Sequence, residues 1–253
     1  MGKRMEAVLY EDFDRLEDSH WWFAGRRAVV REVLRRKLPR RSGLNVLDVG
    51  CGVGGMLVML RELGAVSGID TSEAALGHAR ERLGPGVPLS LGALPDGIPP
   101  GQTYDLVTAF DVIEHIPDAP AALRAVRGAL REGGALVCTV PAYQFLWSRH
   151  DDLNHHQRRY TRALLRRHLE EGGFRMAWSS YFNTLLFPPI AAVRLARKLV
   201  PERGGGAGAS DLKETPGPLN KVLEALFSAE RLVVPRAPLP FGVSLIALAY
   251  PAG

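Results

Sequence analysis

The sequence of 253 residues contains very little cysteine, only Cys51 and Cys138. Two cysteines cannot build the disulfide framework of a small secreted domain. They also form no pair of CxxC half-sites, the usual signature of structural zinc. We therefore expect a protein of a reducing compartment, the cytoplasm.

Long apolar runs are missing as well. A helix that spans a membrane needs about 20 apolar residues, whereas the best candidate, LLFPPIAAV at 185–193, is short and contains two prolines. The first 14 residues carry basic side chains, but no apolar stretch follows them as in a secretory signal. We expect a soluble chain that contacts a membrane surface at most.

Positive charge exceeds negative charge only slightly, with 32 Lys and Arg against 27 Asp and Glu. Basic clusters at 35–41, 158–159 and 166–167 lie in helical stretches that also carry acids, which is typical of solvated helix faces. A nucleic-acid surface would instead concentrate basic side chains with exposed aromatics. We expect no nucleic-acid partner, and the composition leaves the oligomeric state open.

From residue 44 onward, short apolar segments alternate with helical stretches. The expected strands are 44–50, 65–70, 87–94, 104–110, 135–141, 174–182 and 242–250, and the expected helices are 25–38, 54–63, 71–83, 118–134, 161–171 and 219–233. Such alternation predicts βαβ units. The fold class is therefore α/β: a Rossmann-like, doubly wound, mostly parallel sheet of seven strands, with N-terminal helices and a helical insert before the last strand.

Changes in composition suggest where the parts of the chain begin and end. We expect an N-terminal helical cap (1–43), a Rossmann-like core (44–184), a helical insert (185–240) and a final strand of the core (241–253). Within the insert, residues 201–218 are rich in glycine and proline, which predicts a flexible surface linker.

The strongest chemical signal is the glycine-rich segment LDVGCGVGG, residues 47–55. Its glycines follow a predicted strand and open a predicted helix, so the backbone can turn sharply and approach a ligand. Asp70 ends the next predicted strand, where a carboxylate can accept both ribose hydroxyls of a nucleoside. Together these features predict an adenosine-containing ligand.

Two classes of ligand fit the glycine loop. Gly50, Gly52 and Gly55 satisfy GxGxxG, so a nicotinamide-dependent dehydrogenase stays possible. Asp48 precedes them, and a carboxylate there would repel a pyrophosphate but attract an ammonium or sulfonium group. The alternative is that Asp48 only caps the helix or ties down the loop. The charge argument favours S-adenosylmethionine over NAD.

Four segments together resemble the class I S-adenosylmethionine-dependent methyltransferases: LDVGCGVGG (47–55), GID (68–70), YDLVTAFDVIEHIPD (104–118) and REGGALVCTVPA (131–142). HWWFAGRR (20–27) and DLNHHQRRY (152–160) resemble a bacterial subgroup associated with small-molecule or cell-envelope glycan modification. The resemblance implies S-adenosylmethionine as methyl donor, S-adenosylhomocysteine as product and a small-molecule acceptor.

The resemblance also implies roles for individual residues. The methionine part of the donor would lie against Asp48 and the Gly50–Gly54 loop, and its ribose against Asp70. Many members have an acid after the third strand, but this chain has LGALPD there, so adenine contact is expected through backbone groups or packing. The cofactor residues so implied are Asp48, Gly50, Cys51, Gly52, Gly54, Ile69, Asp70, Thr71, Ala93, Leu94, Asp111 and Val112, with Asp111 beside the sulfonium.

Four of the seven histidines, His150, His155, His156 and His168, follow the fifth predicted strand closely. Ligands of open parallel sheets bind beyond the carboxyl ends of the strands, so this segment should overlook the active site. We predict that His155 or His156 is a general base or substrate ligand, although both could be structural. His168 is expected to be structural.

Other side chains compete for the catalytic role. Tyr160 lies in the same segment, and His115, next to Glu114, is an alternative base. Asp151 and Asp152 with the neighbouring histidines offer oxygen and nitrogen ligands, but their spacing matches no metal motif. We therefore expect no metal.

Two further segments have open interpretations. The segment HWWF (20–23) precedes a basic helix. We predict that it partly covers the cofactor, with His20 or Trp21 nearest the site, and partly packs the helix onto the sheet. Arg26 is expected in a surface ion pair. In 186–200, an apolar face of Pro189, Ala192, Val193, Ala196, Leu199 and Val200 is expected to pack on the protein itself, with a membrane surface as the alternative.

The favoured function is O-methylation of a sugar or secondary metabolite by S-adenosylmethionine. The alternatives are methylation of a lipid-linked or cell-envelope glycan at a membrane surface, an NAD-dependent oxidoreductase, and a non-catalytic binding module at a membrane edge. The sequence leaves the acceptor and the methylated atom open.

Overall fold

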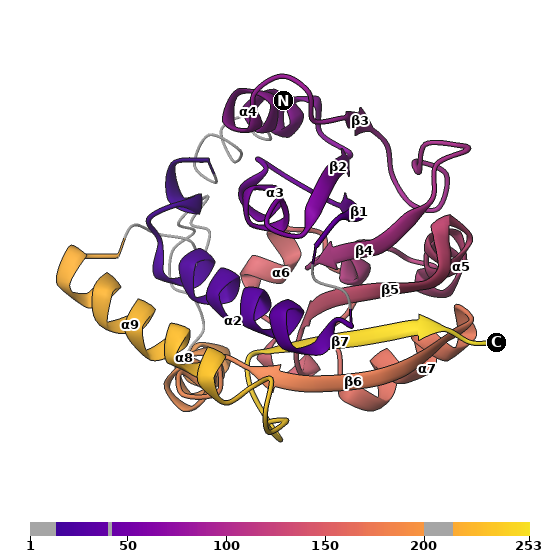
Figure 1. Ribbon diagram of the computed structural model, residues 1–253. Helices are drawn as coiled ribbons and strands as arrows, with labels where there is room; N and C mark the ends of the chain where they lie inside the picture. Colours follow the sequence, from indigo (N-terminus) through magenta and orange to yellow (C-terminus); the bar gives the residue numbers. More distant parts are fainter. Residues whose placement is uncertain (1–13, 40–41, 200–214) are drawn as a thin grey trace.

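The computed structural model describes residues 14–39, 42–199 and 215–253 (Figure 1). Its centre is a sheet of seven strands in the order β3-β2-β1-β4-β5-β7-β6. The strands are β1 (Leu44–Val49), β2 (Gly64–Asp70), β3 (Leu89–Leu91), β4 (Tyr104–Phe110), β5 (Leu130–Pro141), β6 (Phe174–Phe182) and β7 (Ser244–Pro251). Strands β1 to β5 are parallel, and β7 runs antiparallel to both β5 and β6. The predicted fold class is confirmed.

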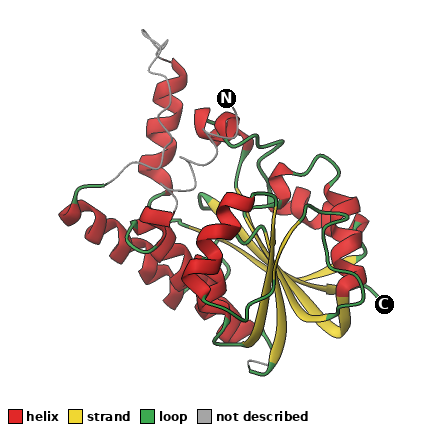
Figure 2. Cartoon of the chain, turned by 90° about the horizontal axis from the view of Figure 1, so that it is seen from above, coloured by secondary structure: helices red, strands yellow, loops and turns green. Residues whose placement is uncertain are grey.

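Helices cover both faces of the sheet (Figure 2). On one face lie α2 (Trp21–Lys37), α3 (Gly55–Leu60), α4 (Glu73–Leu83) and α9 (Gly217–Ala229), and on the other lie α5 (Ala119–Ala129) and α7 (Arg162–Glu171). Successive residues of a strand point to opposite faces, so Val46 joins the first core and Leu47 the second. The central strands are apolar on both sides for this reason.

The remaining helices lie in the connections. A 3-10 turn, η1 (Ile113–His115), follows β4; another, η2 (Gln144–Leu146), and the short helix α6 (Arg149–Leu153) follow β5. Between β6 and β7 the chain forms α8 (Phe187–Leu199), α9 and a third turn, η3 (Glu230–Leu232). Within the described part of the chain, no helix combines the length and the apolar character that crossing a bilayer requires.

The helix predicted over 118–134 ends earlier, at Ala129. Leu130 already pairs with Tyr104 of β4, and the pairing then shifts so that Leu106 faces Ala135. Gly133 takes a left-handed φ of 73° inside this irregular stretch. Gly133 and Gly134 thus lie in a bulge of β5, whereas the sequence suggested that they end a helix.

Two predictions about the insert are also corrected. Gly217 and Pro218, expected in the linker, form the first turn of α9, where proline is favoured because its missing N–H has no partner to lose. Residues 201–214 of that linker lie outside the described residues. In α8 the predicted apolar stripe faces outward, with Val193 50% exposed, while Ala191 is buried. The helix packs on its other side.

Candidate active site at the carboxyl edge of the sheet

The candidate site lies where β1 and β4 are neighbours. From this pair the chain adds β2 and β3 on one side and β5 on the other, so the direction of winding reverses there. Ligands of doubly wound sheets bind in the crevice outside the carboxyl ends at such a point. The loop after β1 touches the turn after β4, since a Cβ on Gly50 would overlap the side chain of Val112. Gly52 borders open space instead: a Cβ there would meet none of the described atoms within 4 Å.

Asp70, at the end of β2, holds the glycine loop. One carboxylate oxygen accepts a hydrogen bond from the amide of Gly52 at 2.8 Å, and the other accepts one from the amide of Ser72 at 2.9 Å. The Ile69 carbonyl accepts from the amides of Gly50 (2.8 Å) and Cys51 (3.1 Å). The end of β2 therefore shapes the glycine loop directly.

Asp48, the carboxylate of the glycine segment, is only 2% exposed. The Thr108 hydroxyl on β4 donates a hydrogen bond to it at 2.6 Å. Burial raises the pKa of Asp48 to about 7, against the hydrogen bond from Thr108 and the charge of Arg26, which lower it. A cationic ligand nearby would favour the charged form, so the electrostatics suit a sulfonium or ammonium group.

Asp111 follows β4 in a left-handed conformation with φ of 58°. Its carboxylate pairs with the guanidinium of Arg26 from α2 at 2.6 Å, and the Arg26 side chain is only 9% exposed. The guanidinium also lies over the ring of Trp22, 4.6 Å from its centroid. The prediction of a surface ion pair for Arg26 is therefore wrong: helix α2 carries this arginine into the site.

The aromatic residues Trp21 to Phe23 form the start of helix α2, whereas the sequence suggested that they precede the helix. His20 caps the helix, its Nδ1 accepting from the amide of Trp22 at 3.3 Å. Trp21 packs edge-on against Phe227 of α9, with ring centroids 6.1 Å apart. Through Arg26, Trp22 and Phe23 are the aromatic side chains linked to Asp111, whereas the sequence suggested His20 or Trp21.

A second set of polar groups lies after β5. Asp151 is fully buried, and the same carboxylate oxygen accepts from His156 Nδ1 and from Arg159 Nε, each at 2.8 Å. Its other oxygen accepts from the amide of Ser148 at 2.8 Å. Burial alone would raise the pKa of Asp151, but these bonds and the Arg159 charge hold it well below its usual range. His156 is thereby oriented, with Nδ1 as the protonated nitrogen and Nε2 facing away from Asp151.

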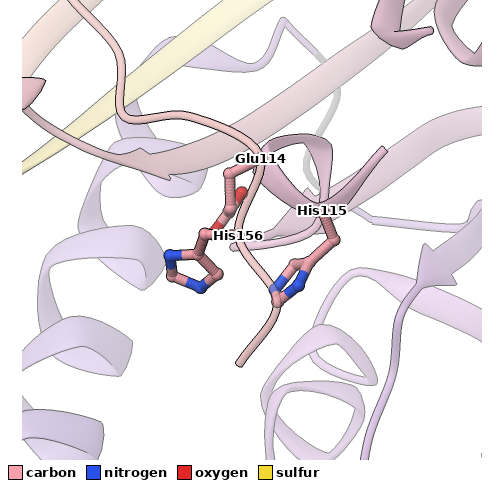
Figure 3. Close-up of side chains that lie close together, drawn as sticks. All are labelled: Glu114, His115 and His156. Atoms are coloured by element: carbon pink, nitrogen blue, oxygen red, sulfur yellow. The ribbon is translucent and has the colours of Figure 1, made fainter. Parts of the chain in front are cut away.

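His115, from the turn after β4, meets His156 with ring centroids 4.5 Å apart. Glu114 lies beside both rings and is fully buried (Figure 3). Neither of its side-chain oxygens has a hydrogen-bond partner among the described residues. Burial, together with the charge of Asp111, raises the pKa of Glu114 well above its usual value, and burial with the charge of His156 lowers that of His115 to about 4.

Other predicted catalytic residues are not brought together with this group. His155 is exposed in a left-handed conformation, φ 55°. Tyr160 is fully buried and its hydroxyl lies 3.2 Å from Nδ1 of His168; burial raises the pKa of Tyr160 to about 12. These contacts make Tyr160 and His168 parts of the core beneath the loop.

The remaining predicted cofactor residues differ in how they face the crevice. The side chains of Ile69 and Cys51 are buried in the two cores. Thr71 and Ala93 are exposed and Leu94 is half-buried, on the loops after β2 and β3.

Sequence reasoning did not identify several groups of the site. In the sequence, Thr108 looks like an ordinary residue of a strand and Glu114 like an ordinary residue of the turn after it. Glu17 was also missed: it pairs with Arg27 at 2.7 Å and packs so closely on Gly55 that a Cβ there would overlap it. A partial signal existed for Arg26 alone, because it stands four residues after Trp22, a spacing that places both on one side of a helix.

Comparisons with known proteins agree with this architecture. The "Methyltransferase domain" family model matches residues 22–177, more than half of the chain. A probable S-adenosylmethionine-dependent methyltransferase of Mycolicibacterium smegmatis is 33% identical over 162 residues, which cover 63% of this chain and 61% of that protein. A ubiquinone biosynthesis O-methyltransferase of a Methylobacterium species is 30% identical over 158 residues, 53% of this chain and 62% of that protein. The chain thus spans about three fifths of the length of these relatives.

Solved structures share the fold at low sequence identity. An S-adenosylmethionine-dependent methyltransferase from Clostridium acetobutylicum matches with a TM-score of 0.57 at 13% identity, over the whole of both chains. A phosphoethanolamine N-methyltransferase 2 of Haemonchus contortus in complex with S-adenosyl-L-methionine matches with a TM-score of 0.57 at 18% identity, over 87% of this chain and 51% of that one.

Proposed function

The chain belongs to the class I S-adenosylmethionine-dependent methyltransferases, and we propose that it transfers the methyl group of S-adenosylmethionine to a hydroxyl oxygen of a small-molecule acceptor. The observation that carries this proposal is that three carboxylates, Asp48, Asp70 and Asp111, lie at the carboxyl ends of the neighbouring strands β1, β2 and β4, beside the loop in which Gly52 borders open space. Family membership argues against the oxidoreductase and the non-catalytic module. The relative named for O-methylation favours oxygen as the nucleophile.

The donor's position follows from these contacts. The loop from Gly50 to Gly54, with the backbone of Cys51, would hold the methionine portion, and Asp48 would face its positive charge. Asp70 would meet the ribose, and Thr71, Ala93 and Leu94 would border the adenosine. Asp111 and Val112 would lie on the sulfonium side.

The two buried, free cysteines suit a reducing compartment, and we place the enzyme in the cytoplasm.

Methyl transfer breaks the sulfonium–methyl bond and forms an oxygen–methyl bond, releasing S-adenosylhomocysteine and the hydroxyl proton. The leaving group is already activated, so holding the acceptor in line supplies much of the catalysis. His115 and His156 come from the loops after β4 and β5 and border the Asp111 side of the crevice. We propose that the acceptor hydroxyl binds beside this pair, which narrows the predicted catalytic residues to His115 and His156.

Calorimetric titration with S-adenosylmethionine, and in parallel with NADH, tests the donor. We expect micromolar binding of S-adenosylmethionine alone, and binding of NADH alone would overturn the proposal. Methyl transfer from labelled donor to a panel of sugars and phenols then tests the reaction. His156→Ala should keep donor affinity and lose turnover, whereas the matched control His155→Asn should keep both because asparagine tolerates the left-handed backbone.

The outward stripe of α8 favours a second candidate, an acceptor attached to a lipid. Val193 is 50% exposed, and the exposed side chain of Phe145 adjoins Phe187 at the start of the same helix. Apolar side chains beside basic ones suit an anionic membrane surface. Sedimentation with phosphatidylglycerol vesicles should be weakened by Val193→Glu but not by Val58→Glu on α3, which is similarly exposed. Equal sedimentation of both variants would exclude α8 as the contact.

A further inference from the structure

We propose that Glu114, His115 and His156 form a binding site for a divalent transition-metal ion, with Zn²⁺ as the best match. Nothing in the spacing of the sequence pointed to it, because Glu114 and His156 stand far apart in the chain and on different loops. The site itself stands independently, and its role in catalysis rests on the proposed methyl transfer.

The first argument is geometric. One ligand atom from each of the three side chains lies within 4.8 Å of the other two. Zinc bonds of about 2.0–2.1 Å place tetrahedral ligand atoms about 3.3 Å apart, so modest side-chain rotation closes the site. Figure 3 shows the carboxylate and both rings converging on one region. The two loops are tied together by the Gln157 amide, which donates to the Glu114 carbonyl at 2.8 Å.

The second argument is the state of Glu114. Its side chain is fully buried, and neither oxygen has a hydrogen-bond partner among the described residues. A buried carboxyl group without partners costs free energy that a purely structural side chain could avoid. A cation between Glu114 and the two imidazoles would satisfy these oxygens.

The third argument is the orientation of His156. Its Nδ1 is held by Asp151 at 2.8 Å, and Asp151 is itself held by Arg159 and Ser148. Metal-binding histidines commonly donate one ring N–H to a carboxylate, which aims the other nitrogen at the metal. The carboxylate–histidine pair that this arrangement needs is therefore present before any ion binds.

The donor set selects the kind of ion. Two imidazole nitrogens and one carboxylate oxygen suit Zn²⁺ and similar transition metals, whereas Mg²⁺ and Ca²⁺ prefer oxygen ligands alone. Three protein ligands leave a coordination position open, as in catalytic zinc sites. That position could take the acceptor hydroxyl and lower its pKa, so that its proton leaves to solvent as the oxygen–methyl bond forms.

Calorimetric titration of the full chain, first freed of metal with a chelator, tests the site. We expect one Zn²⁺ per chain and at least 100-fold weaker binding of Mg²⁺. Glu114→Gln and His156→Ala should each weaken Zn²⁺ binding at least 100-fold. The controls Asp152→Asn and His155→Asn, which change exposed neighbours, should leave it unchanged. Equal Zn²⁺ affinity in all four variants, or no binding to the wild type, would overturn the site.

X-ray absorption of the Zn²⁺-loaded wild type provides a measurement that does not depend on the folding of variants. Two imidazoles and no sulfur in the first coordination shell are expected, and a sulfur ligand would overturn the assignment. Donor binding is measured separately on the same samples. Binding of Zn²⁺ without binding of S-adenosylmethionine would support the metal site and refute the proposed function. Binding of S-adenosylmethionine without binding of Zn²⁺ would refute the metal site and leave the proposed function standing.

Discussion

Asp70 and Glu114 are both buried carboxylates at the carboxyl ends of parallel strands: Asp70 is the last residue of β2, and Glu114 lies in the turn after β4. Their surroundings are opposite. Asp70 accepts hydrogen bonds from the amides of Gly52 and Ser72, one on each oxygen. Glu114 has no partner for either oxygen among the described residues.

The difference separates a carboxylate that holds a loop in place, Asp70, from one that we propose binds a metal ion, Glu114. The partners of Asp70 are backbone amides of its own and the preceding loop, so its charge is stabilised as soon as the βαβ unit forms. For Glu114 the cost of burial outweighs the nearby charges of Arg159 and Arg26, so its pKa stays well above the usual value. Asp48 is intermediate, with a single hydrogen bond from Thr108.

The largest effect is expected for Asp48→Asn, through pH. The folded-state pKa of about 7 lies above the unfolded value of about 3.9, so the folded chain keeps a proton that the unfolded chain has lost between these values. Stability of the wild type therefore falls as pH rises from about 4 to about 7. The variant lacks this loss and should gain up to about 4 kcal/mol relative to wild type, three pKa units at about 1.4 kcal/mol each.

Urea unfolding at several pH values between 4 and 8 measures this gain. If the difference in the free energy of unfolding between the two proteins stays constant with pH, burial does not raise the pKa of Asp48.

Asp70→Ala should act in the opposite direction and lower stability. It removes two hydrogen bonds to a charged group, worth about 1.5–3 kcal/mol each, so we expect about 3 kcal/mol lower free energy of unfolding. Affinity for S-adenosylmethionine should also fall, by about 10- to 150-fold. The exposed neighbour Glu73→Ala is the matched control and should change both by little. Unchanged donor affinity in Asp70→Ala would remove the ribose assignment.

Glu114→Met should have the smallest effect, and its sign is what matters. In metal-free protein the substitution replaces an unpartnered buried carboxyl with an apolar side chain of similar length, so the free energy of unfolding should rise by about 1–2 kcal/mol. Thermal or urea unfolding in the presence of a chelator measures it. A loss of stability comparable to that in Asp70→Ala would mean that the two carboxylates are alike after all.

The sequence allowed the fold and the glycine loop to be predicted because their signals are local. The glycine segment, Asp70 and the strands beside them lie within one βαβ unit, and the apolar periodicity of each strand is readable from neighbouring residues. Misjudged elements depended on distant partners. The bulge at Gly133 is set by pairing with β4, and the outward stripe of α8 is set by which side meets the rest of the protein.

The acceptor side of the site was decided by tertiary structure. Arg26 reaches Asp111 across 85 positions of sequence, and His156 meets His115 only because β4 and β5 are adjacent in the sheet. The sequence by itself determined the order of strands and helices and the donor-binding loop, since both follow from short-range backbone preferences and side-chain alternation. Burial and pairing between distant loops are properties of the packed chain, and they alone decided which carboxylates and histidines came together.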